Sequence, residues 1–212
     1  SDGMGTIMEA PSHPHRVGER VVIDPSLHWG ANPRAQGPDF EVLGMPSQGT
    51  LAEEIVMHAS LVHPAPEHLS DVEAAALPLG GVTAFRAMMR QGALQREETV
   101  VITGIGGGVA TFALLFAVAA GARVIVTSSQ QHKIESALAL GAHAGVLTSE
   151  DGWAKRVRAM GPVDLVVDSV GGDTMNDLAD IVRPGGRIAI YGASRGAVPS
   201  MNLHRILWKQ IT

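Results

Sequence analysis

The pattern of apolar and polar positions changes near residue 80. Beyond that point, short β-branched runs alternate with segments whose apolar residues recur at helical spacing. This alternation predicts βαβ units and a parallel sheet. Five strands are predicted, at residues 99–103, 123–127, 144–147, 163–168 and 187–191. Their runs are apolar on both faces, so we expect helices on each side of the sheet.

The segments between these strands predict helices. One follows the second strand and ends at Gly141, and another carries Trp153 and Val157 on its buried face. A third is expected to begin at Asp173, whose side chain can cap it, and to end at the Pro184 turn. Residues 203–212 predict a further helix that runs into another strand, so we expect the chain to be part of a longer protein.

The part before Pro78 is rich in proline and histidine and lacks this alternation. Residues 20–24, 51–59 and 60–66 have the pattern of strands, and the glycine- and proline-rich stretch at 28–50 predicts a long irregular loop. We therefore expect two domains, an all-β unit at 1–78 and an α/β unit at 79–212.

The composition counts against several classes of protein, among them nucleic-acid-binding, membrane-spanning and disulfide-bonded proteins. The 45% hydrophobic and 17% charged content is that of an ordinary globular protein. A net charge of −5 gives no basic surface for nucleic acid, and the longest apolar tract is too short for a membrane span. The absence of cysteine excludes disulfides and cysteine-ligated zinc. No signal peptide is recognisable at Ser1, so a cytoplasmic location is expected.

The stretch "VVITGIGGGVATF" is the first candidate site, because a strand ends there in a glycine cluster and a helix begins. Gly104 permits a sharp turn, and Gly106 and Gly107 let the backbone approach a pyrophosphate. Ile105, Gly108 and Val109 complete the loop, whose free N–H groups face the phosphates. The spacing has one residue more than the usual fingerprint, and a tight structural turn is the alternative.

The end of the second strand, "VTSSQQHK", indicates which dinucleotide binds. Chains that bind NAD usually carry an acid there, which accepts from the ribose 2′-OH. Ser128 and Ser129 occupy that place here, with Lys133 one turn further on. Two hydroxyls and a lysine can bind a 2′-phosphate that a carboxylate would repel, so NADPH is the predicted cofactor. Alternatively, the two serines cap the following helix.

The same residues weigh against other nucleotide-dependent enzymes. The missing acid counts against S-adenosylmethionine enzymes, and the loop lacks the Gly-Lys-Ser/Thr of a P-loop. A short-chain dehydrogenase needs a lysine four residues after its tyrosine, but Tyr191, the one tyrosine, is followed there by Arg195.

Several motifs in register resemble the medium-chain dehydrogenase/reductase superfamily, in its zinc-free quinone-oxidoreductase and enoyl-reductase branch. They are "GERVVIDP", "EAAALPLGGVTAFRAM", "TVVITGIGGGVATFA", "GARVIVTSS", "VDLVVDSVGG" and "VRPGGRIAIYGAS". "NPRAQGPDFEVLG" is similar to a subgroup named zinc-type alcohol-dehydrogenase-like. The resemblance implies a partial GroES-like domain, then a Rossmann domain that lacks its last strand, and a homodimer or higher homo-oligomer.

The resemblance also implies further site residues. It places Thr83 near the nicotinamide, and Val170, Gly192, Ala193 and Ser194 along the nicotinamide half of the cofactor, although these glycines also suit simple turns. Asp168 has a structural alternative as a buried acid at a strand end, and no catalytic residue is assigned.

Zinc-dependent relatives differ from this chain at each metal-binding position. Ser1 and Asp2 stand in place of their His and Glu, and no cysteine follows Leu79. The loop "HWGANPRAQGPDF" replaces their four-cysteine lobe. His13 and His15 lie in a proline-rich turn without a third ligand nearby, so we expect no metal.

Without zinc to polarise a carbonyl, the resemblance favours hydride transfer from NADPH to a quinone or an α,β-unsaturated carbonyl. Two alternatives stay open. One is an alcohol or aldehyde reductase that lacks zinc, and the other is a non-catalytic NADPH-binding sensor or scaffold.

Overall fold

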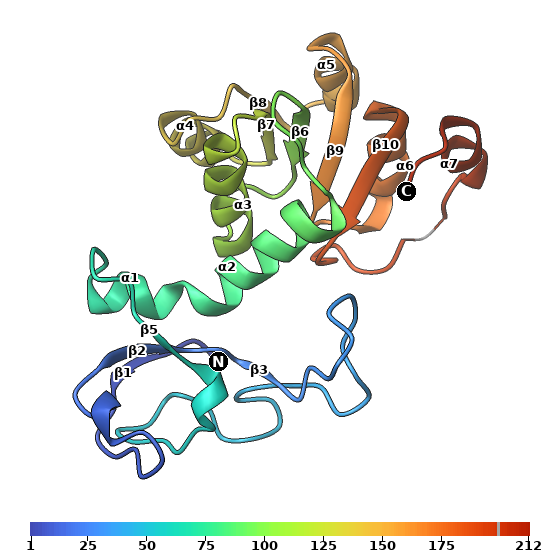
Figure 1. The fold of residues 1–212 in the computed structure, drawn as a ribbon. Helices are drawn as coiled ribbons and strands as arrows, with labels where there is room; N and C mark the ends of the chain where they lie inside the picture. The colour runs from blue at the N-terminus through green and yellow to red at the C-terminus, as the bar shows by residue number, and fades with distance from the viewer. Residues whose placement is uncertain (199) are drawn as a thin grey trace. The chain divides into compact units, whose positions relative to one another are not determined.

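The computed structural model describes residues 1–198 and 200–212. Two compact units make up the chain, Ser1–Val82 and Thr83–Thr212, and the division falls inside helix α2 (Pro78–Phe85). Figure 1 shows each unit, with the small sheet in blue and the α/β unit in green to red.

The first unit is built on a short antiparallel sheet. Its strand order is β1 (Met4–Thr6), β2 (Arg20–Ile23), β5 (Val62–Pro64), and a two-stranded ladder joins β3 (Ser26–Leu27) to β4 (Glu41–Val42). Two 3₁₀ turns, η1 (Pro14–Arg16) and η2 (Ala59–Leu61), precede β2 and β5. Helix α1 (Asp71–Ala76) begins with a capping box between Ser70 and Glu73.

The prediction of a strand at 51–59 is wrong, because the structure has no strand there. Leu51 and Val56 are fully exposed, and the segment forms no ladder with any described strand. Its apolar side chains at Leu51 and Val56 bury nothing, so the segment lacks the half-buried face that a strand of this sheet would need. The loop expected at 28–50 is confirmed except for the residues of β4.

The second unit follows the predicted alternation of strands and helices. Its elements are η3 (Arg86–Gln91, a π-helix), β6 (Thr99–Ile102), α3 (Gly108–Ala119), β7 (Arg123–Ser128), α4 (Gln131–Ala139), β8 (Ala144–Leu147), α5 (Trp153–Ala159), β9 (Val163–Asp168), η4 (Gly172–Thr174), α6 (Met175–Ile181), β10 (Val182–Ile190) and α7 (Leu203–Lys209). All five predicted strands are present, and they pair in parallel in the order β10-β9-β6-β7-β8. This is a Rossmann-type α/β fold.

Both faces of this sheet are buried, as the continuous apolar runs predict. Val100 and Ile102 of β6 pack on the side of α3 and α4, in one hydrophobic cluster. Val101 points to the other face, into a cluster that contains residues of α5 and α6. The alternation along β6 thus divides the core into two layers, and helices lie on either side of the sheet in Figure 1.

Two details differ from the expectations. Helix α6 begins after Thr174, which is its N-cap, whereas Asp173 lies one residue earlier, inside η4, and its carboxylate pairs with Arg195. The helix also ends at Ile181, before the Pro184 turn, since Val182 is already paired with β9.

In the described residues after α7 no strand is assigned, but the backbone of Thr212 is hydrogen-bonded to β10. Ile188 N donates to Thr212 O at 2.8 Å, and Thr212 N donates to Gly186 O at 3.2 Å.

Candidate functional site

A pocket lies at the carboxyl ends of β6, β7 and β9. From β6 the chain moves outward to β7 and β8, and then returns to β9 on the other side of β6. This reversal is a topological switch point, where ligands of open α/β sheets bind. The cavity measures about 200 Å³. Its lining is Thr103, Gly104, Ile105, Thr127, Ser128, Ser129, Lys133, Thr148, Trp153, Val170, Thr174, Leu178, Ser194 and Arg195.

The glycine loop after β6 leaves room that a side chain would fill. Gly104 has φ +63°, and a Cβ there would lie 2.8 Å from Ser169 Oγ. Gly106 has φ +104°, and its Cβ would lie 2.5 Å from Lys133 Cδ. Both positions therefore require glycine. Ile105 N donates to Thr127 O at 3.0 Å, which ties the loop to β7.

Helix α3 starts at the end of this loop. The first N–H groups of a helix have no intrahelical partner, and the N-cap here, Gly107, has no side chain to accept from them. These groups, with the positive end of the helix dipole, suit a phosphate. The loop therefore fits the pyrophosphate of a dinucleotide.

The end of β7 carries hydroxyl groups where NAD-binding chains carry an acid. Ser128 is buried, and its Oγ accepts from Gln130 N at 3.1 Å, whereas Ser129 is exposed. The N-cap of α4 is Gln130, which makes no side-chain cap, so neither serine caps the helix. The Lys133 stem lies against Gly106, which brings the lysine to the glycine loop.

A buried carboxylate holds the loop that follows β9. Asp168 is fully buried and accepts three hydrogen bonds, from Thr103 Oγ1 at 2.5 Å, Val170 N at 3.2 Å and Gly171 N at 2.9 Å. The hydroxyl of Thr103 comes from the neighbouring strand end, so this network joins the ends of β6 and β9. Asp168 is thus a buried acid at a strand end with a structural role, which is the alternative predicted for it from the sequence.

The segment after β10 packs on this loop through its backbone. Ser194 N donates to Ser169 O at 3.0 Å, and Arg195 N donates to Val170 O at 2.9 Å. Tyr191 begins the segment, and burial raises the pKa of its hydroxyl above the ordinary value of 10.0 although the side chain is hydrogen-bonded to Ser169. Its phenol therefore stays protonated at neutral pH.

Residues 108–212 match the family described as zinc-binding dehydrogenase. The zinc-type alcohol dehydrogenase-like protein YogA of Leptosphaeria maculans is 35% identical over 219 residues, which cover 93% of this chain and 61% of that protein. The quinone oxidoreductase-like protein 2 of Bos taurus is 30% identical over 177 residues, which cover 81% of this chain and 50% of that protein. The chain thus spans between half and two thirds of the length of these relatives.

The solved structures that are similar to this chain also include a dehydrogenase and a reductase. An NAD-dependent alcohol dehydrogenase superposes with a TM-score of 0.90 at 32% identity, over 99% of this chain and 64% of that one. The chain belongs to the medium-chain dehydrogenase/reductase superfamily. Another neighbour is the 2-octenoyl-CoA carboxylase reductase CinF in complex with NADP and 2-octenoyl-CoA, with a TM-score of 0.88 at 25% identity over 100% of this chain and 54% of that one.

Seven of the site residues predicted from the sequence line the pocket at the carboxyl ends of β6, β7 and β9. They are Gly104, Ile105, Ser128, Ser129, Lys133, Val170 and Ser194. Gly106, Gly107, Gly108 and Val109 lie in the adjoining loop and first turn of α3 but outside the lining. Gly192 and Ala193 precede Ser194 and do not line the cavity, and Thr83, in α2, is not among the lining residues either.

Sequence reasoning missed half of the lining. Thr103, Thr127 and Thr148 each stand at the end of a predicted strand, and the carboxyl ends of parallel strands meet at one edge. That signal was available in the sequence. Trp153, Thr174, Leu178 and Arg195 come from helices and a loop, and no local pattern marks them as pocket residues.

The described lining carries no acidic side chain. It has two cationic side chains, Lys133 and Arg195, and seven hydroxyl groups from serine and threonine residues. Hydroxyls and cations in this arrangement suit an anionic ligand.

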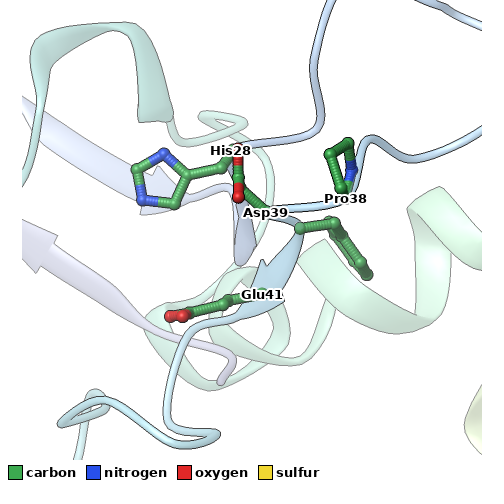
Figure 2. Close-up of a pocket in the computed structure, with 5 residues that line it drawn as sticks. His28, Pro38, Asp39 and Glu41 are labelled. Atoms are coloured by element: carbon green, nitrogen blue, oxygen red, sulfur yellow. The ribbon is translucent and has the colours of Figure 1, made fainter.

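A second cavity, of about 550 Å³, lies in the first unit, at the loop that begins at His28. His28, Pro38, Asp39, Phe40 and Glu41 line it. Figure 2 shows His28 and Pro38 on opposite sides of Asp39. Among the described residues, no group of three or more His, Cys, Asp or Glu side chains could hold a metal ion.

The carboxylate of Asp2 is hydrogen-bonded within the first unit. Its Oδ1 accepts from Leu79 N at 2.6 Å, at the beginning of α2. In the part of the chain that the structure describes, no helix is both long and apolar enough to cross a membrane.

Proposed function

We propose that this chain binds NADPH in the pocket at the switch point, and that the complete protein transfers a hydride from NADPH to a quinone or an α,β-unsaturated carbonyl. The observation that carries the proposal is the chemistry of the pocket. Glycine backbone, hydroxyls and two cations meet there at a helix N-terminus, and the described lining includes no acid.

Each part of the pocket has a role in this proposal. The free N–H groups at the start of α3 bind the pyrophosphate, which approaches because Gly104 and Gly106 carry no Cβ. Ser129 and Lys133 bind the 2′-phosphate beside β7, with Ser128 behind them. Val170 and Ser194 lie along the nicotinamide half, on the β9 side of the pocket.

NADPH, when bound, supplies the hydride from C4 of its nicotinamide. The relatives support a conjugated acceptor, since one is named a quinone oxidoreductase-like protein and one neighbour holds 2-octenoyl-CoA, an α,β-unsaturated thioester, together with NADP. The alcohol dehydrogenase neighbour favours a second candidate, reduction of an aldehyde or ketone to an alcohol.

Titration of the protein with NADPH and NADH tests the cofactor. We expect NADPH to bind at least about tenfold more tightly, the value of one charge-assisted contact to the 2′-phosphate. Lys133→Met should remove most of this preference, and Ser129→Asp should reverse it through repulsion. Equal or tighter binding of NADH by the unaltered protein would contradict the roles of Ser129 and Lys133.

Turnover is measured with the full-length protein, NADPH and a panel of quinones, enones and aldehydes, by following the absorbance of the reduced nicotinamide. Reduction of quinones or enones supports the proposal. Tight NADPH binding without turnover of any acceptor would favour a sensor or scaffold instead. Zinc in stoichiometric amount in the purified protein would contradict the expectation of a metal-free site.

A further inference from the structure

Arg195 brings a second cation to the pocket from the side away from Lys133. It follows β10 and lies against the loop after β9, whereas Lys133 belongs to α4, which follows β7. Strand β6 lies between β7 and β9, and the glycine loop extends from its end. Two cationic side chains therefore flank the glycine loop, one on each side.

The backbone of Arg195 is held in place. Its N–H donates to Val170 O at 2.9 Å, and the next residue, Gly196, accepts from Gly172 N at 3.1 Å. Gly172 has φ +60°, and a Cβ there would lie 2.8 Å from Arg195 Cβ. This close approach sets the point from which the arginine side chain enters the pocket.

The guanidinium itself is held more loosely. Arg195 Nη1 pairs with Asp173 Oδ1 at 3.3 Å, and the two side chains are 51% and 75% exposed. Exposed ion pairs contribute little free energy, because water screens the two charges. Such a pair can exchange its carboxylate for a phosphate, which offers more acceptor oxygens and matches the guanidinium fork.

We infer that Arg195 binds the pyrophosphate of the dinucleotide, and that Asp173 holds the guanidinium when the pocket is empty and competes with the ligand for it. This inference rests on the proposed binding of a dinucleotide. The pyrophosphate is the anion in question because it lies over the glycine loop between the two cations. The 2′-phosphate belongs to the β7 side, next to Lys133.

If Arg195 binds the pyrophosphate and Lys133 the 2′-phosphate, substitutions of the two residues should change the affinities for NADH and NADPH differently. Both NADH and NADPH carry the pyrophosphate, so Arg195→Ala should weaken the two by the same factor. That factor should be about three- to tenfold, in the lower range for a hydrogen bond to a charged group, since the site is partly exposed. Lys133→Met should weaken NADPH alone.

Asp173→Asn tests the competition. It should tighten both dinucleotides by about twofold, because an exposed ion pair no longer has to be broken. The double variant D173N/R195A should bind like R195A, since Asp173 acts only through the arginine. Arg195→Lys should restore part of the affinity, and thermal unfolding of each variant checks that it is folded.

The measurement is a fluorescence or calorimetric titration of the full chain with each dinucleotide. Loss of NADPH affinity alone in R195A would move Arg195 to the 2′-phosphate and overturn the pyrophosphate assignment. Unchanged affinity for both dinucleotides in R195A, with tight binding by the unaltered protein, would overturn this inference but not the proposed function. Failure of the unaltered protein to bind either dinucleotide would overturn both.

Discussion

Asp168→Asn removes the charge of the buried carboxylate that joins the ends of β6 and β9 without changing the size of the side chain. In the native structure, Oδ1 accepts from Thr103 and Val170, and Oδ2 accepts from Gly171. An asparagine keeps one acceptor oxygen but places an NH₂ group against one of the backbone donors. At least one buried N–H then lacks an acceptor, and the remaining bonds lose their charge assistance.

The cost follows from these contacts. A buried donor left without a partner costs about 1–3 kcal/mol, and a hydrogen bond to a charged group contributes about 1.5–3 kcal/mol. We expect D168N to lower the free energy of unfolding by about 2–4 kcal/mol, and the melting temperature by on the order of 10 °C. D168A leaves all three donors without their acceptor and should cost more.

Urea denaturation followed by tryptophan fluorescence measures the effect. Thr103→Val removes one of the three donors and should cost about 1.5–3 kcal/mol, while Thr103→Ser keeps the hydroxyl and serves as its matched control. D168N should also weaken dinucleotide binding, because the loop it releases carries Val170. If D168N unfolds within about 0.5 kcal/mol of the unaltered protein, the network does not stabilise the fold as argued.

Three further predictions follow from local geometry. Gly106→Ala should destabilise the chain by at least about 1 kcal/mol and weaken dinucleotide binding, because Gly106 has a positive φ and an added Cβ would contact Lys133. Gly108→Ala is the control and should fold normally, because the space around an added Cβ is open there. Lys209→Met should lower the urea midpoint, equivalent to about 1–3 kcal/mol, because its Nζ donates to three backbone carbonyls at the end of α6. Burial and the nearby carboxylates raise the pKa of Asp177 above its ordinary value of 3.8, so the stability contributed by its protonated form is lost as the pH rises through that raised pKa. Asp177→Asn should therefore raise the urea midpoint at neutral pH and leave it unchanged in acid below the ordinary value.

The sheet of the second unit was predictable because each strand is a continuous apolar run with a break on either side. Burial on both faces makes such runs conspicuous, and each predicted strand overlaps an observed one, although β10 begins at Val182, five residues before the predicted start at 187. The first unit was harder, because its strands have only two to four residues. Residues 51–59 have a strand-like composition, but Leu51 and Val56 are fully exposed, and composition alone does not show which apolar residues find a surface to pack against.

The candidate site was predictable where its chemistry is local. The glycine loop and the residues from Ser128 to Lys133 each form a short motif, and both lie at the pocket. Asp173 shows the limit of local reasoning, since its position suits a helix cap, but the chain forms the 3₁₀ helix η4 there and α6 begins only after Thr174. Which strand ends converge depends on the order of strands in the sheet, and no single motif contains that order.

The lining of the pocket is positively charged although the whole chain is negatively charged. The positions of the acidic side chains explain this difference. The chain has a net charge of −5, yet Asp168 and Asp173, which belong to the segment from the end of β9 to α6 that contributes Val170 and Thr174 to the lining, are both engaged. Asp168 is buried and accepts three hydrogen bonds, Asp173 pairs with Arg195, and neither acid is among the lining residues. A dinucleotide that displaced Asp173 from Arg195 would gain a cation and leave the carboxylate in water, where its charge costs little. Affinity for an anion therefore depends on which acids are already bonded within the fold and not on their number.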